Sequence, residues 1–169
     1  MKNKLKTLNI IGLIWEVAAS FIFHFLYEWT SNNNIVGLFT PISESVWEHG
    51  KLLVFPFLLF IVIEYFLLKP KDKTNYWATK LFIIIINTIL LPILFYTYSG
   101  IIGQNFLVVD ILIAILLVVL SYSLNYLLTY NNYTFKHKCF VITLGITIIL
   151  AFFIFTFYPP NLPWFNISG

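Results

Sequence analysis

The sequence predicts an all-α protein, an integral membrane bundle of five transmembrane helices with a cytoplasmic N-terminus and an extracytoplasmic C-terminus. Of its 169 residues, 60% are hydrophobic and only 10% are charged, whereas a soluble domain has about 25% charged residues. Nine of the ten lysines fall in alternate gaps between five long apolar stretches. Short loops that are rich in Lys remain in the cytoplasm during insertion, so this alternation predicts the orientation of every span.

Each apolar stretch is long enough to cross a bilayer, for which about 20 mostly apolar residues are needed. We expect one transmembrane domain, 1–169, whose helices cover 8–29, 45–68, 76–98, 105–126 and 139–158. The lysines of the cytoplasmic segments are Lys2, Lys4, Lys6, Lys69, Lys71, Lys73, Lys80, Lys136 and Lys138. Lys51 alone departs from the pattern.

The ends of the predicted helices carry residues typical of helix ends in membranes. Aromatic residues that favour the membrane interface occur near the ends, among them Trp29, Tyr126 and Tyr158. At the start of the second helix, Ser45 is followed by Glu48 in the spacing of a capping box.

Prolines and polar residues inside the spans predict contacts between helices. Pro56 and Pro92 should kink their helices, and neighbouring helices can satisfy the carbonyl groups that a proline leaves free. We expect Asn87 and Asn125 to join helices through hydrogen bonds. Glu64 lies one and a half turns before Lys69, so we expect it to extend toward the head groups or to pair there.

The charge balance favours lipid as the partner and excludes nucleic acid. The net charge is +3, but the chain contains no Arg for bidentate binding of phosphate. The lysines lie in the predicted cytoplasmic segments, where they orient the chain and contact anionic lipid head groups. The sequence does not predict a protein partner.

Ionisable residues gather toward the predicted outer half. Charged side chains within a membrane are costly and usually face protein or a wet cavity. We therefore expect one outward-facing pocket for a small ligand, an ion or a lipid head group. Its candidate residues come from three helices and the second helix's leading loop: Glu16, His24, Glu28, Glu44, Ser45, Trp47, Glu48, His49 and Asp110.

Each of these residues also has a simpler interpretation. Glu44 and Glu48 could lie among head groups and favour the positive end of the helix dipole. His24 could be a neutral imidazole bonded to a carbonyl group, and Asp110 could be its structural partner or that of Lys51. A purely structural role is less convincing for Glu16, because a carboxylate so deep in the membrane requires a partner or protonation.

Three kinds of chemistry remain open for the pocket. One is metal binding: zinc or another divalent metal could be held by His24, His49 and one acid. For the acid we select Asp110 over Glu28 and Glu48. No HExxH motif is present, so no cofactor is firmly predicted. We favour a binding protein; the alternatives are a metal-dependent membrane hydrolase and proton-coupled transport through Glu16.

Several strings resemble one family of small multi-pass bacterial membrane proteins, domain of unknown function 6512. They are His24-Phe-Leu-Tyr-Glu-Trp29, Gly37-Leu-Phe-Thr-Pro41, Glu44-Ser-Val-Trp-Glu-His49 with Lys51-Leu-Leu, and Tyr158-Pro-Pro160 with Pro163-Trp-Phe165. Ser43 stands where the family usually has Asn. The resemblance implies a multi-pass protein of a bacterial cytoplasmic membrane and no particular activity.

Overall fold

A computed structural model describes residues 2–165, which form six α-helices, one short 3-10 helix and no strand. Five of the helices are long and apolar enough to cross a membrane, which confirms the predicted all-α fold with five such helices. The elements are α1 (Lys2–Trp29), α2 (Asn34–Gly37), α3 (Val46–Leu68), α4 (Lys73–Ile102), α5 (Leu107–Tyr130), α6 (Lys138–Phe157) and η1 (Pro163–Phe165).

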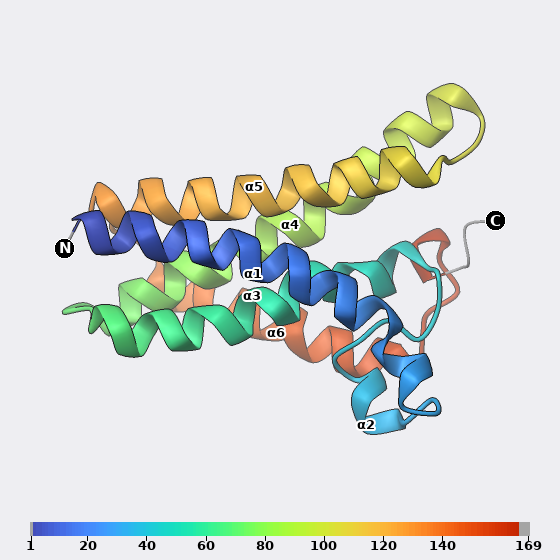
Figure 1. Cartoon of the computed structure of the whole chain (residues 1–169), viewed down its shortest axis with the longest axis horizontal. Helices are drawn as coiled ribbons and strands as arrows, with labels where there is room; N and C mark the ends of the chain where they lie inside the picture. Colours follow the sequence, from blue (N-terminus) through green and yellow to red (C-terminus); the bar gives the residue numbers. More distant parts are fainter. Residues whose placement is uncertain (1, 166–169) are drawn as a thin grey trace.

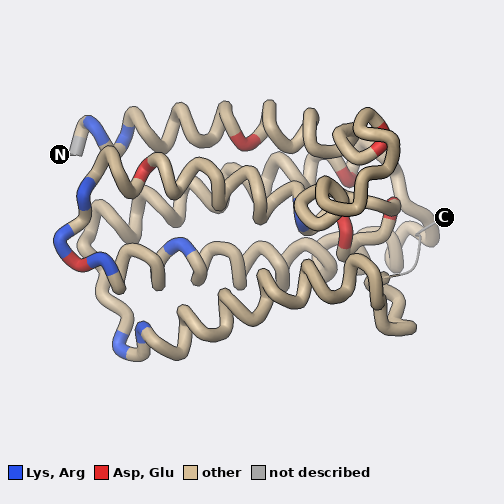
Figure 2. The backbone as a smooth tube through the Cα atoms, turned by 90° about the horizontal axis from the view of Figure 1, so that it is seen from below, with Lys and Arg blue, Asp and Glu red and all other residues tan. Residues whose placement is uncertain are grey.

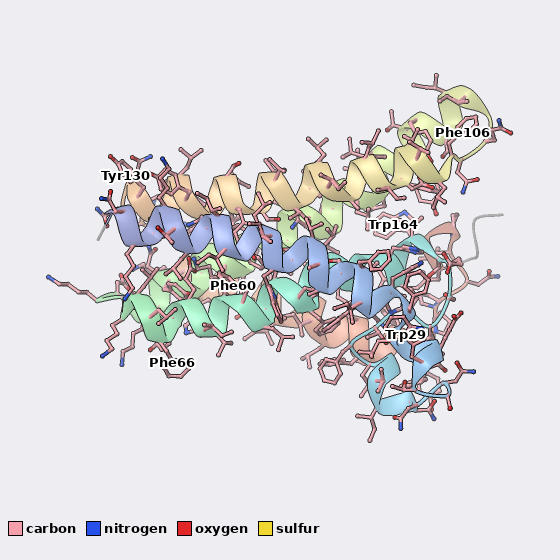
Figure 3. All side chains as sticks on the ribbon, viewed as in Figure 1. Trp29, Phe60, Phe66, Phe106, Tyr130 and Trp164 are labelled. Carbon is pink, nitrogen blue, oxygen red and sulfur yellow. The ribbon has the colours of Figure 1, made fainter. Side chains whose placement is uncertain are left out.

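Four of the long helices form a closed bundle. Helix α1 packs against α3 and α5, and α4 packs against the same two helices from the other side. Helix α6 lies outside this group, against α4 and α3 (Figure 1). The outer surface is apolar: Phe66 points away from the bundle and is 67% exposed, whereas Phe60 is 5% exposed (Figure 3). A bilayer would cover such a surface.

Small residues allow the helices to approach closely. A Cβ atom on Gly145 of α6 would lie 2.6 Å from the Leu81 Cβ of α4, and one on Gly12 of α1 would lie 2.3 Å from Cε1 of Tyr122 on α5. Both distances are far below van der Waals contact. Glycine at these positions therefore sets the spacing of α4 with α6 and of α1 with α5.

The carbonyl group that Pro56 leaves without a partner is satisfied by the neighbouring helix, as expected. Proline has no N–H, so the Leu52 carbonyl one turn earlier has no partner within α3. The Ser20 hydroxyl of α1 donates to this carbonyl at 2.7 Å. Trp15 also donates its indole N–H to the Pro56 carbonyl at 3.1 Å. Both bonds join α1 to α3.

The two ends of the bundle differ in charge. Lysines gather at the end that holds the start of α1 and the α3–α4 and α5–α6 connections, and most acidic residues lie at or near the opposite end (Figure 2). We call these the lysine-rich end and the acidic end. At the lysine-rich end, Asp72 caps α4 through the Asn75 N–H and pairs with Lys138. The Lys138 ammonium, assisted by the backbone N–H of Asn75, lowers the pKa of the exposed Asp72 carboxyl.

A fully buried polar network lies between α3, α4 and α5. Glu64 pairs with Lys80 at 2.6 Å and accepts hydrogen bonds from Tyr76 and Asn125. We expected Glu64 to extend toward the head groups or to pair there, close to Lys69. It is paired, but its partner is Lys80, whose side chain α4 carries inside the bundle.

Both predicted asparagine contacts are present. Asn125 of α5 also donates to Asn9 of α1, so the network reaches a fourth helix. Asn87 of α4 donates to the Ser121 hydroxyl of α5 at 2.6 Å.

Candidate metal-binding site

Three potential metal ligands converge at the acidic end. His24 lies in the last turns of α1, Glu44 in the loop before α3, and His49 in the first turn of α3. One ligand atom from each residue lies within 4.8 Å of the other two. Within residues 2–165, no other group of three or more His, Cys, Asp or Glu side chains approaches so closely.

The backbone of α3 orients the His49 ring. Its Nδ1 lies 3.0 Å from the Ser45 carbonyl oxygen. A carbonyl oxygen only accepts, so Nδ1 carries the hydrogen, and the Nε2 of a neutral ring presents a lone pair. Such a bond from the second ring nitrogen is typical of metal-binding histidines.

The lone pair of His49 faces a carboxylate. Nε2 lies 3.4 Å from Oε2 of Glu44. Two acceptor atoms at this distance repel one another unless a proton or a metal ion lies between them. The separation also suits two ligands of one tetrahedral zinc ion, which lie about 3.3 Å apart when each bond is about 2.0–2.1 Å.

His24 completes the group from a different helix. Its ring centre lies 5.4 Å from that of His49, and the rings are tilted by 43°. Its Nδ1 is buried and has no hydrogen-bond partner. A buried polar atom without a partner is costly and requires an explanation; a ligand held between the three side chains would supply one.

The loop that carries Glu44 is held in place by a buried lysine. The Lys51 ammonium pairs with Glu48 at 2.8 Å and donates to the carbonyl oxygens of Gly37 and Thr40 at 2.7 and 3.3 Å. Glu48 in turn accepts from the Ile42 N–H at 2.9 Å. Lys51 therefore departs from the lysine pattern because it binds the connection between α1 and α3.

Ser45 and Glu48 support the site without belonging to the three-residue group. The Ser45 hydroxyl accepts from the Glu48 N–H, which is one half of the predicted capping box. The Glu48 carboxylate is directed to Lys51 and Ile42, which leaves Glu44 as the carboxylate beside His49.

Trp47 belongs to an aromatic cluster beside this region. It stacks on Phe152 of α6 at 4.4 Å and contacts Phe165 of η1 at 4.9 Å between ring centres. Trp47 thereby attaches the described part of the C-terminal segment to the start of α3. Glu28 is exposed, one turn beyond His24 on α1.

Asp110 lies on a different part of the acidic end. It accepts a hydrogen bond from the Tyr98 hydroxyl across the α4–α5 turn. Figure 3 shows Phe106, at the tip of this turn, well separated from Trp29 at the end of α1. The structure therefore brings His24 and His49 together with Glu44, and Asp110 is not in that group.

Glu16 is separate from the three-residue group. It lies about halfway along α1 and is fully buried, and neither carboxyl oxygen has a hydrogen-bond partner.

The comparison with known proteins identifies a family but no activity. The chain matches no curated protein and no solved structure. One family model, described as a family of unknown function, DUF6512, matches residues 2–169. The resemblance seen in the sequence is thereby confirmed, and the chain belongs to the DUF6512 family.

Proposed function

We propose that this protein is a multi-pass protein of a bacterial cytoplasmic membrane that binds a divalent transition-metal ion, of the zinc class, on its extracytoplasmic side. His24, Glu44 and His49 are the ligands. The observation that carries the proposal is the approach of the His49 Nε2 lone pair to the Glu44 carboxylate while the backbone occupies Nδ1. Imidazole and carboxylate are suitable ligands for zinc.

The orientation follows from the separation of charge. Lysine-rich segments remain in the cytoplasm, so the lysine-rich end faces inward and the three ligands face outward. The side chain of Glu44 is 68% exposed and that of His49 is 33% exposed. An ion could therefore reach the site from the aqueous phase without crossing the bundle.

A metal-dependent hydrolase is a second candidate, favoured by the number of ligands. Two histidines and one carboxylate leave a fourth tetrahedral position for water, as in catalytic zinc sites. Glu28, exposed and one turn from His24, is the candidate base that would take a proton from this water. The hydrolase and the metal-binding protein would have the same ligands. They differ in whether the bound ion activates a water molecule.

Metal content and affinity of the full-length protein in detergent test the binding proposal. We expect one zinc ion per chain, and at least about a 100-fold loss of affinity in His49→Ala, because even outer-shell changes cost 10–100-fold. His24→Ala and Glu44→Gln should also weaken binding. Asp110→Asn is the matched control and should bind zinc as the unmodified protein does.

Two results would refute the proposal. One is the absence of zinc binding by the folded, unmodified protein. The other is unchanged binding after replacement of both His24 and His49. If zinc binds, hydrolysis of activated esters that depends on zinc and is lost in Glu28→Gln would favour the hydrolase. Zinc binding without such activity would favour the binding role.

A further inference from the structure

The centre of the bundle contains an acid that the proposed metal site does not use. Glu16 has no solvent exposure, and both of its carboxyl oxygens are buried without a hydrogen-bond partner. It lies two helical turns from His24 on α1 and does not belong to the metal-ligand group. None of the ion pairs among residues 2–165 includes Glu16.

Helix α5 supplies the polar group next to Glu16. The Tyr122 hydroxyl lies beside the Glu16 carboxyl, although the two groups are not placed for a hydrogen bond in this structure. The hydroxyl is also buried and has no other partner. Gly12, one turn before Glu16, makes room on α1 for the Tyr122 ring.

The other charged groups around this position are already paired. On α3, Phe60 packs against α1 at Gly12, one turn before Glu16. Glu64, one turn further along α3, interacts electrostatically with Tyr122 but is neutralised by Lys80 of α4. Lys51, toward the acidic end of α3, is held by Glu48. Neither of these two buried lysines is therefore available to offset a negative charge on Glu16.

An ionised carboxylate in this position would be very unfavourable. A charge that is removed from water and left without a partner is usually avoided by a change of protonation state. A neutral carboxylic acid can both donate and accept a hydrogen bond, and so can a phenol. In the acid form, Glu16 and the neighbouring Tyr122 hydroxyl can each donate or accept, whereas an ionised Glu16 could only accept.

We infer that Glu16 is a proton-binding site in the middle of the membrane. It holds a proton at neutral pH in the packed bundle, and the Tyr122 hydroxyl is the donor available to its carboxylate when the proton leaves. The ligand of this site is thus the proton itself. The inference is independent of the metal proposal, because the two sites share no residue.

Infrared spectroscopy of the full-length protein in lipid nanodiscs tests this inference. A protonated carboxyl group has a C=O stretching band that is separate from the carboxylate bands. The chain has only seven acidic residues, so single substitutions can assign the band. We expect a protonated-carboxyl band at neutral pH in the unmodified protein, its loss in Glu16→Gln and its retention in Glu28→Gln, the exposed control on the same helix.

Glu16→Gln should also fold normally, because glutamine reproduces the shape and neutrality of the protonated acid. Its thermal unfolding temperature at pH 7 should match that of the unmodified protein. The absence of a protonated-carboxyl band at neutral pH, or its persistence in Glu16→Gln, would overturn the proton site.

Tyr122→Phe tests the partner while it leaves Glu16 in place. Removal of the hydroxyl takes away the donor that stabilises the carboxylate, so the band should persist to higher pH than in the unmodified protein. If both proteins lose the band at the same pH, Tyr122 has no part in the site.

Discussion

The Lys80 ammonium of α4 lies 2.6 Å from Oε2 of Glu64 on α3, and both side chains are fully buried. The pair is surrounded by groups that satisfy its remaining bonds: Tyr76 donates to Glu64, and the Asn125 amide contacts both residues. The charges are therefore compensated within the protein, as the burial of charged groups requires.

Removal of one member of this pair should be strongly destabilising. We expect Glu64→Gln or Lys80→Met to lower the free energy of unfolding by about 3–5 kcal/mol, because the remaining charge is buried without compensation. Thermal and denaturant unfolding in detergent measure the effect. The double variant, which leaves no charge, should lose less than the sum of the single variants. An additive loss would show that the two residues do not interact.

The Ser20–Leu52 hydrogen bond predicts a second double-mutant cycle. Ser20→Ala should cost about 1–3 kcal/mol, because it leaves the part-buried Leu52 carbonyl without a donor. In a Pro56→Ala background, the new Ala N–H can bond to that carbonyl within α3. Ser20→Ala should then cost clearly less. Equal costs in the two backgrounds, measured by unfolding in detergent, would contradict this account of how the Leu52 carbonyl is satisfied.

The contact between α4 and α6 predicts that Gly145 cannot be enlarged. The Cβ atom of Gly145→Ala would lie 2.6 Å from the Leu81 Cβ, which cannot rotate away. We expect a loss of about 1–3 kcal/mol, as for other overpacked contacts. Gly100→Ala in α4 is the control, because a Cβ atom there meets nothing within 4 Å. The unfolding temperature of this control should be unchanged or slightly higher.

The capping carboxylate Asp72 predicts a dependence of stability on pH. Lys138 and the Asn75 N–H lower its pKa in the folded protein from the usual 3.8. Its stabilising contribution is therefore complete above that unfolded value and is lost as the pH falls through the lower folded value. Asp72→Asn should reduce the unfolding temperature slightly at pH 7. The difference from the unmodified protein should vanish at strongly acidic pH; a constant difference would contradict the ionic contribution.

The sequence predicted best those features of the fold that depend on a single stretch of the chain, such as the position of a helix or of its cap. The length and hydropathy of each stretch predicted the five long helices. The Ser45 cap and the compensation of Pro56 were also predictable, because both depend on local chemistry and on the presence of some neighbouring helix.

Properties that depend on which helix faces of the bundle meet could not be predicted in this way. Glu64 pairs with Lys80 because α3 and α4 pack with these positions opposed, and a single sequence does not reveal that rotation. Similarly, Asp110 and Glu44 are both acids near the predicted outer surface. Only the fold places Glu44 beside His49. It places Asp110 next to the turn between α4 and α5, where it accepts from Tyr98. The Ser45 cap, which comes directly after Glu44, was the local signal that Glu44 lies next to the first turn of α3.

The three bonds of Lys51 have a consequence for the thermodynamics of the proposed ion binding. Because the ammonium already joins α3 to Gly37 and Thr40, the segment that presents Glu44 has little conformational freedom left to lose. An arriving cation would then meet a prearranged ligand and would not have to organise a mobile strand of chain. Selectivity among ions would accordingly depend on how well their preferred bond lengths match a nearly rigid frame.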